Sequence, residues 1–230
     1  MPVTKKVHIG LTVLRTQQIG DNSMSIYFER PIGFEFEAGD WVDIDLSDTS
    51  LNGGKVYSLS SSPTESELVI SFRIGISPFK RQLQTVKPGD KLYISQYGND
   101  YGFQLNDKRS SILIAGGIGV APFRSMIKEL YDKKVQCDVQ LIYLNKTDDF
   151  LFKAELDAWR QHLPQLSIGY IVTKDLKRKA REQQLNMLLT KGANRYYIAG
   201  AEAMVEATEH LLIDRGVAVR DIRVDSFGTY

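Results

Sequence analysis

The spacing of apolar residues changes near residue 110, and this change limits the possible folds more than any other feature of the sequence. Before it, apolar and polar residues alternate in short runs, as in strands that bury one face. After it, short apolar runs alternate with segments whose apolar residues recur three and four positions apart, which is typical of strands and helices in turn. Two domains of different architecture are therefore expected.

The first domain is predicted to be an antiparallel β barrel of the Greek-key type over residues 1–108, because many short strands are separated by turn signals. Gly39-Asp40, Asn52-Gly53-Gly54 and Pro88-Gly89-Asp90 are examples of these turns. One short helix is expected over 78–86, where Pro78 suits the first helical position. Strands are expected at 7–14, 24–29, 41–46, 67–74 and 91–97.

The second domain, residues 109–230, is predicted to be an α/β domain with a doubly wound, five-stranded parallel sheet. Its strands are expected at 112–115, 138–144, 167–172, 195–199 and 221–225. A helix through 123–130 follows the first of these strands, and further helices are expected at 151–161, 179–190 and 202–214.

Composition excludes several classes of protein. A net charge of +1 gives no bulk electrostatic reason to expect nucleic acid or a membrane surface as a partner. No apolar run is long enough to span a bilayer, and the N-terminus lacks the apolar core of a signal peptide, so a cytoplasmic location is expected. Cys137 is the only cysteine and the three histidines are far apart, so neither a disulfide nor a metal site is expected.

A glycine-rich turn, AGGIGVAPF at 115–123, connects the first predicted strand of the second domain to its helix. Glycines allow the backbone to approach a phosphate closely, and the N-terminus of the following helix offers free N–H groups and partial positive charge. A tight turn without a ligand is the alternative. Three glycines directly before a helix that starts with proline favour phosphate binding.

Three further stretches are weaker signals when taken alone. In KVYSLSSSP, at 55–63, Tyr57 and Ser58 could present a ring face and a hydroxyl to a flat heteroaromatic ligand, although a water-facing serine-rich edge is the alternative. The stretch at 75–78 leads into the short helix as a second possible anion site. The stretch YYIAG at 196–200, followed by Met204, is again strand, glycine and helix.

These four stretches, in this order, resemble the ferredoxin–NADP reductase superfamily over nearly the whole chain. The resemblance implies an FAD-binding barrel followed by an NAD(P)-binding domain. It implies an enzyme that transfers hydride from NAD(P)H to FAD and passes electrons to a separate small redox protein, such as ferredoxin or flavodoxin, or to an oxygenase component. No iron–sulfur ligands are present in the chain, so the one-electron centre must belong to another protein. The oligomeric state is not indicated.

Site residues follow from the resemblance. Tyr57 would pack on the flavin, Ser58 would bond near its N5, and Tyr230 would cover its nicotinamide face; these three are the expected catalytic residues. The acidic-x-Phe…Tyr ending from Asp225 carries that tyrosine. The residues expected to bind FAD or the dinucleotide are Lys55, Tyr57, Ser58, Leu59, Ser60, Arg73, Ile74, Gly75, Ser77, Pro78, Gly116, Gly117, Gly119, Val120, Ala121, Pro122, Lys146, Thr173, Lys174, Ala199, Gly200, Met204 and Tyr230.

The chain departs from the family pattern at three positions. Lys55 stands where relatives usually have the arginine that contacts the flavin pyrophosphate, and Ala199 and Ala201 stand where relatives often have Cys and Pro. NADPH is slightly favoured over NADH, because Lys146, Thr173 and Lys174 could grip a 2′-phosphate, although the neighbouring Asp148-Asp149 pair suits NADH.

Two alternatives stay open at this point. Lys55 is compatible with an NAD(P)H:flavin reductase that uses free flavin as a substrate. The two alanines are compatible with a non-catalytic or regulatory electron-transfer subunit of a larger complex.

Overall fold

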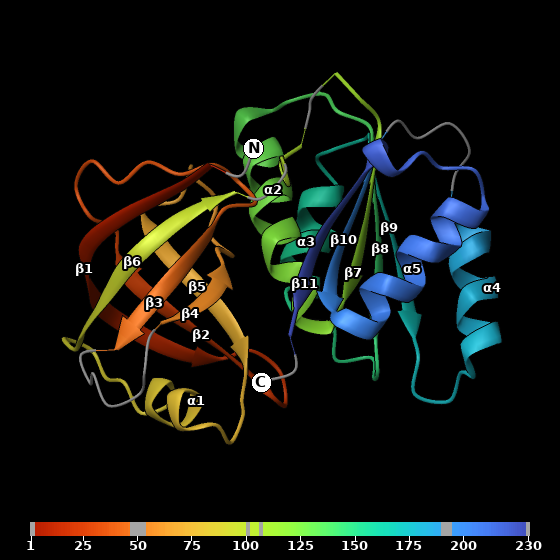
Figure 1. Ribbon diagram of the computed structural model, residues 1–230. Helices are drawn as coiled ribbons and strands as arrows, with labels where there is room; N and C mark the ends of the chain where they lie inside the picture. The colour runs from red at the N-terminus through yellow and green to blue at the C-terminus, as the bar shows by residue number, and fades with distance from the viewer. Residues whose placement is uncertain (1–2, 47–53, 100–101, 106–107, 190–194, 229–230) are drawn as a thin grey trace.

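The computed structural model describes residues 3–46, 54–99, 102–105, 108–189 and 195–228, and it shows two domains side by side (Figure 1). Antiparallel strands form the first domain, and a parallel sheet between helices forms the second. Both expected architectures are confirmed. The expected boundary at 108/109 adjoins residues 106–107, which lie outside the described residues.

The barrel is a six-stranded sheet with the strand order β4-β3-β6-β1-β2-β5, and neighbouring strands are antiparallel. Its elements are β1 (Val3–Gln18), β2 (Ser23–Glu29), β3 (Trp41–Leu46), β4 (Lys55–Ser58), β5 (Glu67–Arg73), α1 (Pro78–Leu83) and β6 (Lys91–Asn99). A bridge between Leu59 and Ile70 joins the chain after β4 to β5. Because β4 and β5 are the two edges of the sheet, this bridge closes the barrel.

Strand β1 is longer than its alternating pattern predicted. Its pairing shifts register between Lys6 and Ile9 against β6, and between Val13 and Arg15 against β2. Such irregularities break the strict alternation of inward and outward side chains, so only residues 7–14 showed it in the sequence.

The serines that follow Tyr57 bond inside the protein. Ser60 donates its amide N–H to the Val69 carbonyl at 2.9 Å, and the Ser61 hydroxyl accepts from the Val69 amide at 2.9 Å. The Ser60 hydroxyl also lies 2.8 Å from that of Ser71, which lies 2.7 Å from that of Ser25. These serines are buried, and a buried hydroxyl is tolerated where it has a hydrogen-bond partner. The serine run therefore closes the barrel, and the water-facing alternative is wrong for Ser60 and Ser61.

The second domain has a parallel sheet with the strand order β11-β10-β7-β8-β9. Its elements are β7 (Ser111–Gly116), η2 (Gly117–Gly119), α2 (Val120–Lys133), β8 (Val139–Asn145), α3 (Lys153–Arg160), β9 (Leu166–Val172), α4 (Arg178–Leu188), β10 (Arg195–Ala201), α5 (Glu202–Asp214), η3 (Val219–Asp221) and β11 (Ile222–Phe227). The chain runs outward from β7 to β9 and then returns to β10 on the other side of β7. Open sheets of this kind bind ligands at the carboxyl ends of the strands where the order reverses.

Helices cover both faces of this sheet, with α2 and α3 on the face toward the barrel and α4 and α5 on the other (Figure 1). Residues of β7 alternate accordingly. Leu113 and Ala115 belong to the core with α2 and α3, whereas Ile112 and Ile114 belong to the core with α4 and α5. The continuous apolar run of this strand reflects burial on both sides. Among the described residues, no helix combines the length and the apolar character needed to cross a bilayer.

Candidate functional site

The end of β4 meets the last strand of the parallel sheet through a hydrogen bond between the domains. The Ser58 hydroxyl donates to a carboxylate oxygen of Asp225 at 2.7 Å, and the serine is buried. Asp225 in β11 pairs with Ala199 in β10, so this contact lies at the carboxyl ends of the strands. The sequence pattern that starts at Asp225 predicts no role for this residue, because only the fold shows that it faces Ser58.

Tyr57 lies beside Ser58 on the barrel and is held by two phenylalanines. Its ring centroid is 5.9 Å from that of Phe72, edge-on, and 6.5 Å from that of Phe79. Burial raises the pKa of the Tyr57 phenol, so the ring stays neutral at physiological pH. Aromatic contacts of this kind fix a ring in one orientation. Tyr57 therefore offers a preorganised aromatic surface next to the Ser58 hydroxyl.

Two cations gather where β5 leads into α1. The side chain of Lys80 lies over Gly75, where a Cβ would come within 2.7 Å of its Cδ and 3.6 Å of its Nζ. Burial and the charge of Arg73 lower the pKa of the Lys80 amine. Neither cation forms an ion pair within the described part of the chain. Two such neighbours are most stable when they share an anion, which fits a phosphate.

Ser77 caps α1, and its hydroxyl accepts from the Lys80 amide at 3.3 Å. Pro78 follows as the first helical residue, as the sequence predicted. Ser77 and Pro78 thus lie on the same turn as the two cations.

The glycine turn packs directly on the end of β10. A Cβ on Gly119 would lie 2.1 Å from the Ala199 carbonyl oxygen. The Met204 methyl lies over both Gly116 and Gly200, where a Cβ would approach it within 2.5 Å and 2.6 Å. The structure therefore brings the two glycine motifs of this domain together. Backbone contacts exclude a side chain at Gly119, and backbone contacts together with a φ of +149° disfavour one at Gly200, whereas at Gly116 only the flexible Met204 side chain would have to move.

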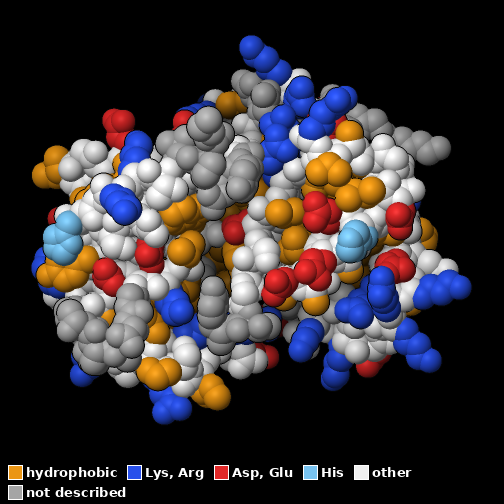
Figure 2. All heavy atoms as spheres, in the orientation of Figure 1, with side chains coloured by type: hydrophobic (Ala, Val, Ile, Leu, Met, Phe, Trp, Pro, Cys, Tyr) orange, Lys and Arg blue, Asp and Glu red, His pale blue; other side chains and the backbone are white. Residues whose placement is uncertain are grey.

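Gly117 differs from the other glycines of the turn because it faces the barrel. Its φ is +57°, and a Cβ there would lie 3.1 Å from Nη2 of Arg73 and 3.8 Å from Oδ1 of Asn145. The guanidinium of Arg73 thus spans from the barrel to the glycine turn. Figure 2 shows the molecular surface hollowed between the two domains. We call this contact region, formed by Tyr57, Ser58, Arg73, Gly117 and Asp225, the glycine-turn junction.

The turns after β8 and β9 lie side by side further along the same edge of the sheet. The Lys174 amide donates to the Lys146 carbonyl at 3.0 Å, and the Thr173 hydroxyl donates to the Asn145 carbonyl at 3.0 Å. Both lysines are exposed. The carboxylate of Asp149 turns away to the barrel, where it accepts from the Asp21 amide at 2.9 Å.

The other predicted residues lie around this junction with varied exposure. Leu59 and Ser60 are fully buried and bond within the protein, and Ile74 donates its amide to the Asn22 carbonyl. Lys55 begins β4 opposite Ile44. Val120, Ala121 and Pro122 are buried in the first turn of α2. Tyr230 lies outside the described residues. The contact of any of these residues with a cofactor stays a prediction.

A family model described as "Oxidoreductase NAD-binding domain" matches residues 113–210. Among curated proteins, the chain is 29% identical over 212 residues to the terephthalate 1,2-dioxygenase reductase component 2 of Comamonas sp, covering 86% of this chain and 62% of that protein. It is 30% identical over 145 residues to human dual oxidase 1, covering 59% of this chain and 9% of that protein. The chain thus spans about three fifths of the length of the reductase components that it matches.

Solved structures share the fold over both domains. A ferredoxin NADP+ reductase from Neisseria gonorrhoeae with bound FAD and NADP superimposes with a TM-score of 0.79 at 19% identity, covering 96% of this chain and 99% of that one. The ferredoxin-NADP+ reductase of Plasmodium falciparum superimposes with a TM-score of 0.80 at 17% identity, covering 96% of each chain.

Proposed function

We propose that the chain is a member of the ferredoxin–NADP reductase superfamily and an FAD-dependent NAD(P)H oxidoreductase, which the match to the NAD-binding domain model and the shared two-domain fold support. In this proposal it passes electrons to a separate acceptor, either a small redox protein or an oxygenase component. The division at 108/109 separates the flavin-binding part from the dinucleotide-binding part. FAD would accept a hydride from the nicotinamide and release electrons to the acceptor.

The observation that carries this proposal is the 2.7 Å hydrogen bond from Ser58 to Asp225. It joins the strand that bears the aromatic surface of Tyr57 to the sheet edge at which open α/β domains bind nucleotides. The ring surface of Tyr57 and the nucleotide-binding edge of the sheet thus lie next to each other. Hydride transfer between two bound rings requires this proximity.

The barrel residues would bind and orient the flavin. Tyr57 supplies a ring face fixed by Phe72 and Phe79. Arg73 and Lys80 supply the positive charge for the pyrophosphate, since neither has an acidic partner within the described residues. Ser58 would direct its hydroxyl at the reacting edge of the ring. Asp225, which accepts from that hydroxyl, would fix its orientation and leave the lone pairs of the Ser58 oxygen free to accept from the ring.

The α/β domain would deliver the nicotinamide. Gly117 has no side chain between the turn and the Arg73 guanidinium, so a pyrophosphate bound at the turn would lie beside a positive charge. Gly200 and Met204 would line the ring pocket. We favour NADPH slightly, because Lys146 and Lys174 are exposed on adjacent turns and Asp149 is engaged with the barrel.

Anaerobic stopped-flow reduction tests the proposal directly. The purified protein should be yellow and should lose its visible flavin absorbance on mixing with NADPH, and more slowly with NADH. Reduced protein should then transfer electrons to one member of a panel of ferredoxin, flavodoxin and oxygenase components. A flavin-loaded protein that neither coenzyme bleaches would remove the proposal.

A flavin reductase is the second candidate, and Lys55 favours it. A lysine lacks the bidentate fork with which arginine holds a pyrophosphate, so flavin is expected to dissociate more easily. Gel filtration separates the two candidates. A flavin that stays with the protein supports the electron-carrier reductase, whereas a colourless protein that reduces added FMN supports the flavin reductase.

A further inference from the structure

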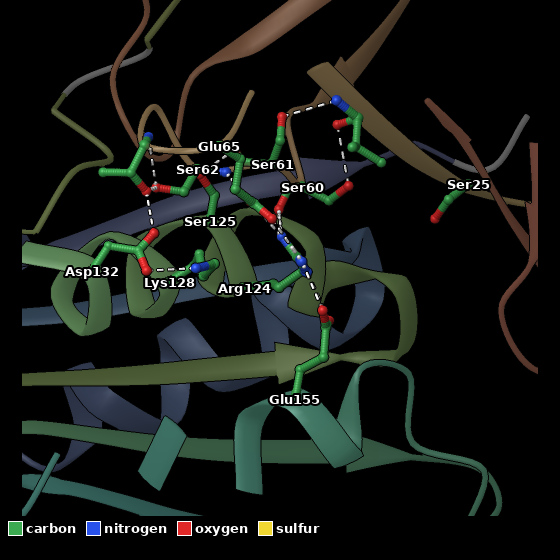
Figure 3. Close-up of polar contacts among 12 residues, drawn as sticks. Ser25, Ser60, Ser61, Ser62, Glu65, Arg124, Ser125, Lys128, Asp132 and Glu155 are labelled. Atoms are coloured by element: carbon green, nitrogen blue, oxygen red, sulfur yellow. Dashed lines mark hydrogen bonds and ion pairs between the residues drawn. The ribbon is translucent and has the colours of Figure 1, made fainter. Parts of the chain in front are cut away.

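Arg124 is a buried charge between the two domains. It lies in α2, five residues after Gly119, and only 10% of its side chain is exposed. Its Nη1 and Nη2 donate to the Glu65 carboxylate at 2.8 and 3.1 Å, and its Nε and Nη2 donate to Glu155 at 2.9 Å each. Nη1 also donates to the Ser60 carbonyl at 2.8 Å (Figure 3). One guanidinium thus connects α2, which carries it, to the barrel and to α3.

The charge of Arg124 is stabilised where it lies. Burial alone would lower the pKa of the guanidinium, but the hydrogen bonds and negative charges of Glu155 and Glu65 raise it above its ordinary value. Both carboxylates are bound in the two-pronged geometry that a planar guanidinium allows and an ammonium does not. The side chain is therefore held in one orientation.

The barrel segment that Arg124 binds is itself closed into a rigid loop. The Glu65 carboxylate accepts from the Ser62 amide at 2.7 Å, and the Glu65 amide donates to the Ser62 carbonyl at 3.0 Å. Ser125 adds a bond of 2.6 Å to the Ser61 carbonyl. Figure 3 shows these groups facing α2 together. We call the contact of Ser60, Ser61 and Glu65 with Arg124 and Ser125 the arginine seam.

The seam is close along the chain to both halves of the glycine-turn junction. Ser60 follows Ser58 by two residues. Arg124 lies one helical turn after Val120, about 6 Å along the axis of the helix that the glycine turn begins. Only short segments of chain therefore separate the seam from Ser58 and from the glycine turn.

We propose that Arg124 is a positioning residue, which holds the ring-binding end of β4 in register with the glycine turn through its bond to Glu65. This inference rests on the proposed function. The relative position of β4 and the glycine turn affects catalysis only if the flavin and nicotinamide rings meet at the glycine-turn junction. A misplacement of about 1 Å between reacting groups can cost about a hundredfold in rate. The seam then sets the hydride-transfer rate without touching either ring.

The two carboxylates on Arg124 offer a matched pair of variants. Glu65 belongs to the barrel, whereas Glu155 belongs to α3 in the same domain as Arg124. Glu65→Gln and Glu155→Gln each remove one negative charge from the same guanidinium. Only the first weakens the bond between domains, so a role in general stability predicts similar effects and a positioning role predicts different ones.

The kinetic experiment uses the full chain loaded with FAD and compares single-turnover flavin reduction at saturating coenzyme. We expect Glu65→Gln to lower the rate constant about tenfold with the coenzyme KM changed less than about twofold, and Glu155→Gln to change both less than about twofold. Equal slowing by both variants, or no slowing by either, would overturn the proposal.

Amide hydrogen exchange provides a readout that needs no activity. Residues 60–65 and the α2 amides around Arg124 should exchange faster in Glu65→Gln than in Glu155→Gln, while the rest of the barrel is unchanged. Faster exchange confined to 60–65 would reflect only the bond between Ser62 and Glu65 within the barrel and would contradict the positioning role. Equal exchange in the two variants would contradict the positioning role. If the parent protein is not reduced by either coenzyme, the proposed function fails, and the exchange comparison still decides whether Glu65 ties the domains through Arg124.

Discussion

Two of the contacts between the domains differ in kind, the arginine seam and the glycine-turn junction. The seam combines one bidentate ion pair, between Glu65 and the buried Arg124, with hydrogen bonds from Arg124 and Ser125 to the backbone carbonyls of Ser60 and Ser61. The junction joins the domains through the hydroxyl of Ser58 and the carboxylate of Asp225, with Arg73 reaching toward Gly117. This difference suggests that the molecule separates two tasks, because contacts that fix the domains need not occupy the surface on which cofactors bind. Variants in each region test this separation.

The largest effect is expected from Gly119→Ala, in the glycine turn next to the junction. A Cβ there would meet the Ala199 carbonyl oxygen at 2.1 Å, so backbone must move. We expect a loss of about 3 kcal/mol in the free energy of unfolding, together with loss of coenzyme binding. Urea denaturation measures the free energy of unfolding, and coenzyme titration measures the binding.

The matched control is Gly10→Ala, where the nearest atom to a Cβ is 3.8 Å away in the ring of Tyr93. It should change stability by less than about 1 kcal/mol. If both glycine variants unfold at the same urea concentration, the packing of the turn on β10 is not the constraint described here.

Arg124→Met should have the next largest effect, on stability. It leaves Glu65 and Glu155 without their shared partner in a mostly buried contact. We expect a loss of about 2 kcal/mol, less than for a fully buried pair, because the two carboxylates are 23% and 43% exposed. Arg15→Met is the control, since the Arg15–Glu67 pair lies on the barrel surface and should contribute less than about 1 kcal/mol. Equal losses would mean that the seam is no stronger than a surface ion pair.

Ser58→Ala and Ser125→Ala compare one hydroxyl at the junction with one hydroxyl at the seam. We expect flavin reduction to slow about tenfold, equivalent to about 1.4 kcal/mol in the activation barrier, with a stability loss of about 1 kcal/mol. Ser125→Ala removes a hydroxyl bond of 2.6 Å from the seam and should change the rate less than about twofold. Slower reduction in Ser125→Ala than in Ser58→Ala would reverse the assignment of chemistry to the junction.

The smallest effect is expected at the far end of the coenzyme, from Lys174→Ala. We expect the KM for NADPH to rise about threefold and that for NADH to stay constant, because an exposed cation contributes only about 0.6 kcal/mol to phosphate binding. The effect should fade as salt is added. Lys179→Ala, an exposed lysine further along in α4, is the control. A change in the KM for both coenzymes would argue against a 2′-phosphate contact at Lys174.

Local pattern was enough to predict both architectures. The alternation of apolar residues and the turn signals predicted five of the six barrel strands of the described residues, all except β4, although the register shifts of β1 hid both of its ends. The strand–glycine–helix order predicted that Gly116 and Gly200 would lie at one edge of the sheet, and the methyl of Met204 contacts both. These predictions succeeded because each depends on residues that are neighbours in the sequence or on one rule of sheet topology.

Contacts between distant parts of the chain could not be predicted in this way. The sequence predicts that the serines after Tyr57 face either a ligand or water. In the structure, Ser60 and Ser61 form hydrogen bonds with β5, and the Ser61 carbonyl accepts one from Ser125 in α2. Arg124 follows the glycine turn by a few residues, and nothing in its neighbourhood in the sequence indicates Glu65 as a partner.

The sequence by itself therefore determined the two kinds of domain, the glycine turn and the aromatic–hydroxyl pair at the end of β4. Only the tertiary structure decided which groups those residues face. Asp225 meets Ser58 across 167 positions of the chain, and Arg124 meets Glu65 across 59. The reason is physical: periodicity records which face of an element is buried, whereas the partner of a buried polar group depends on how complete domains pack together.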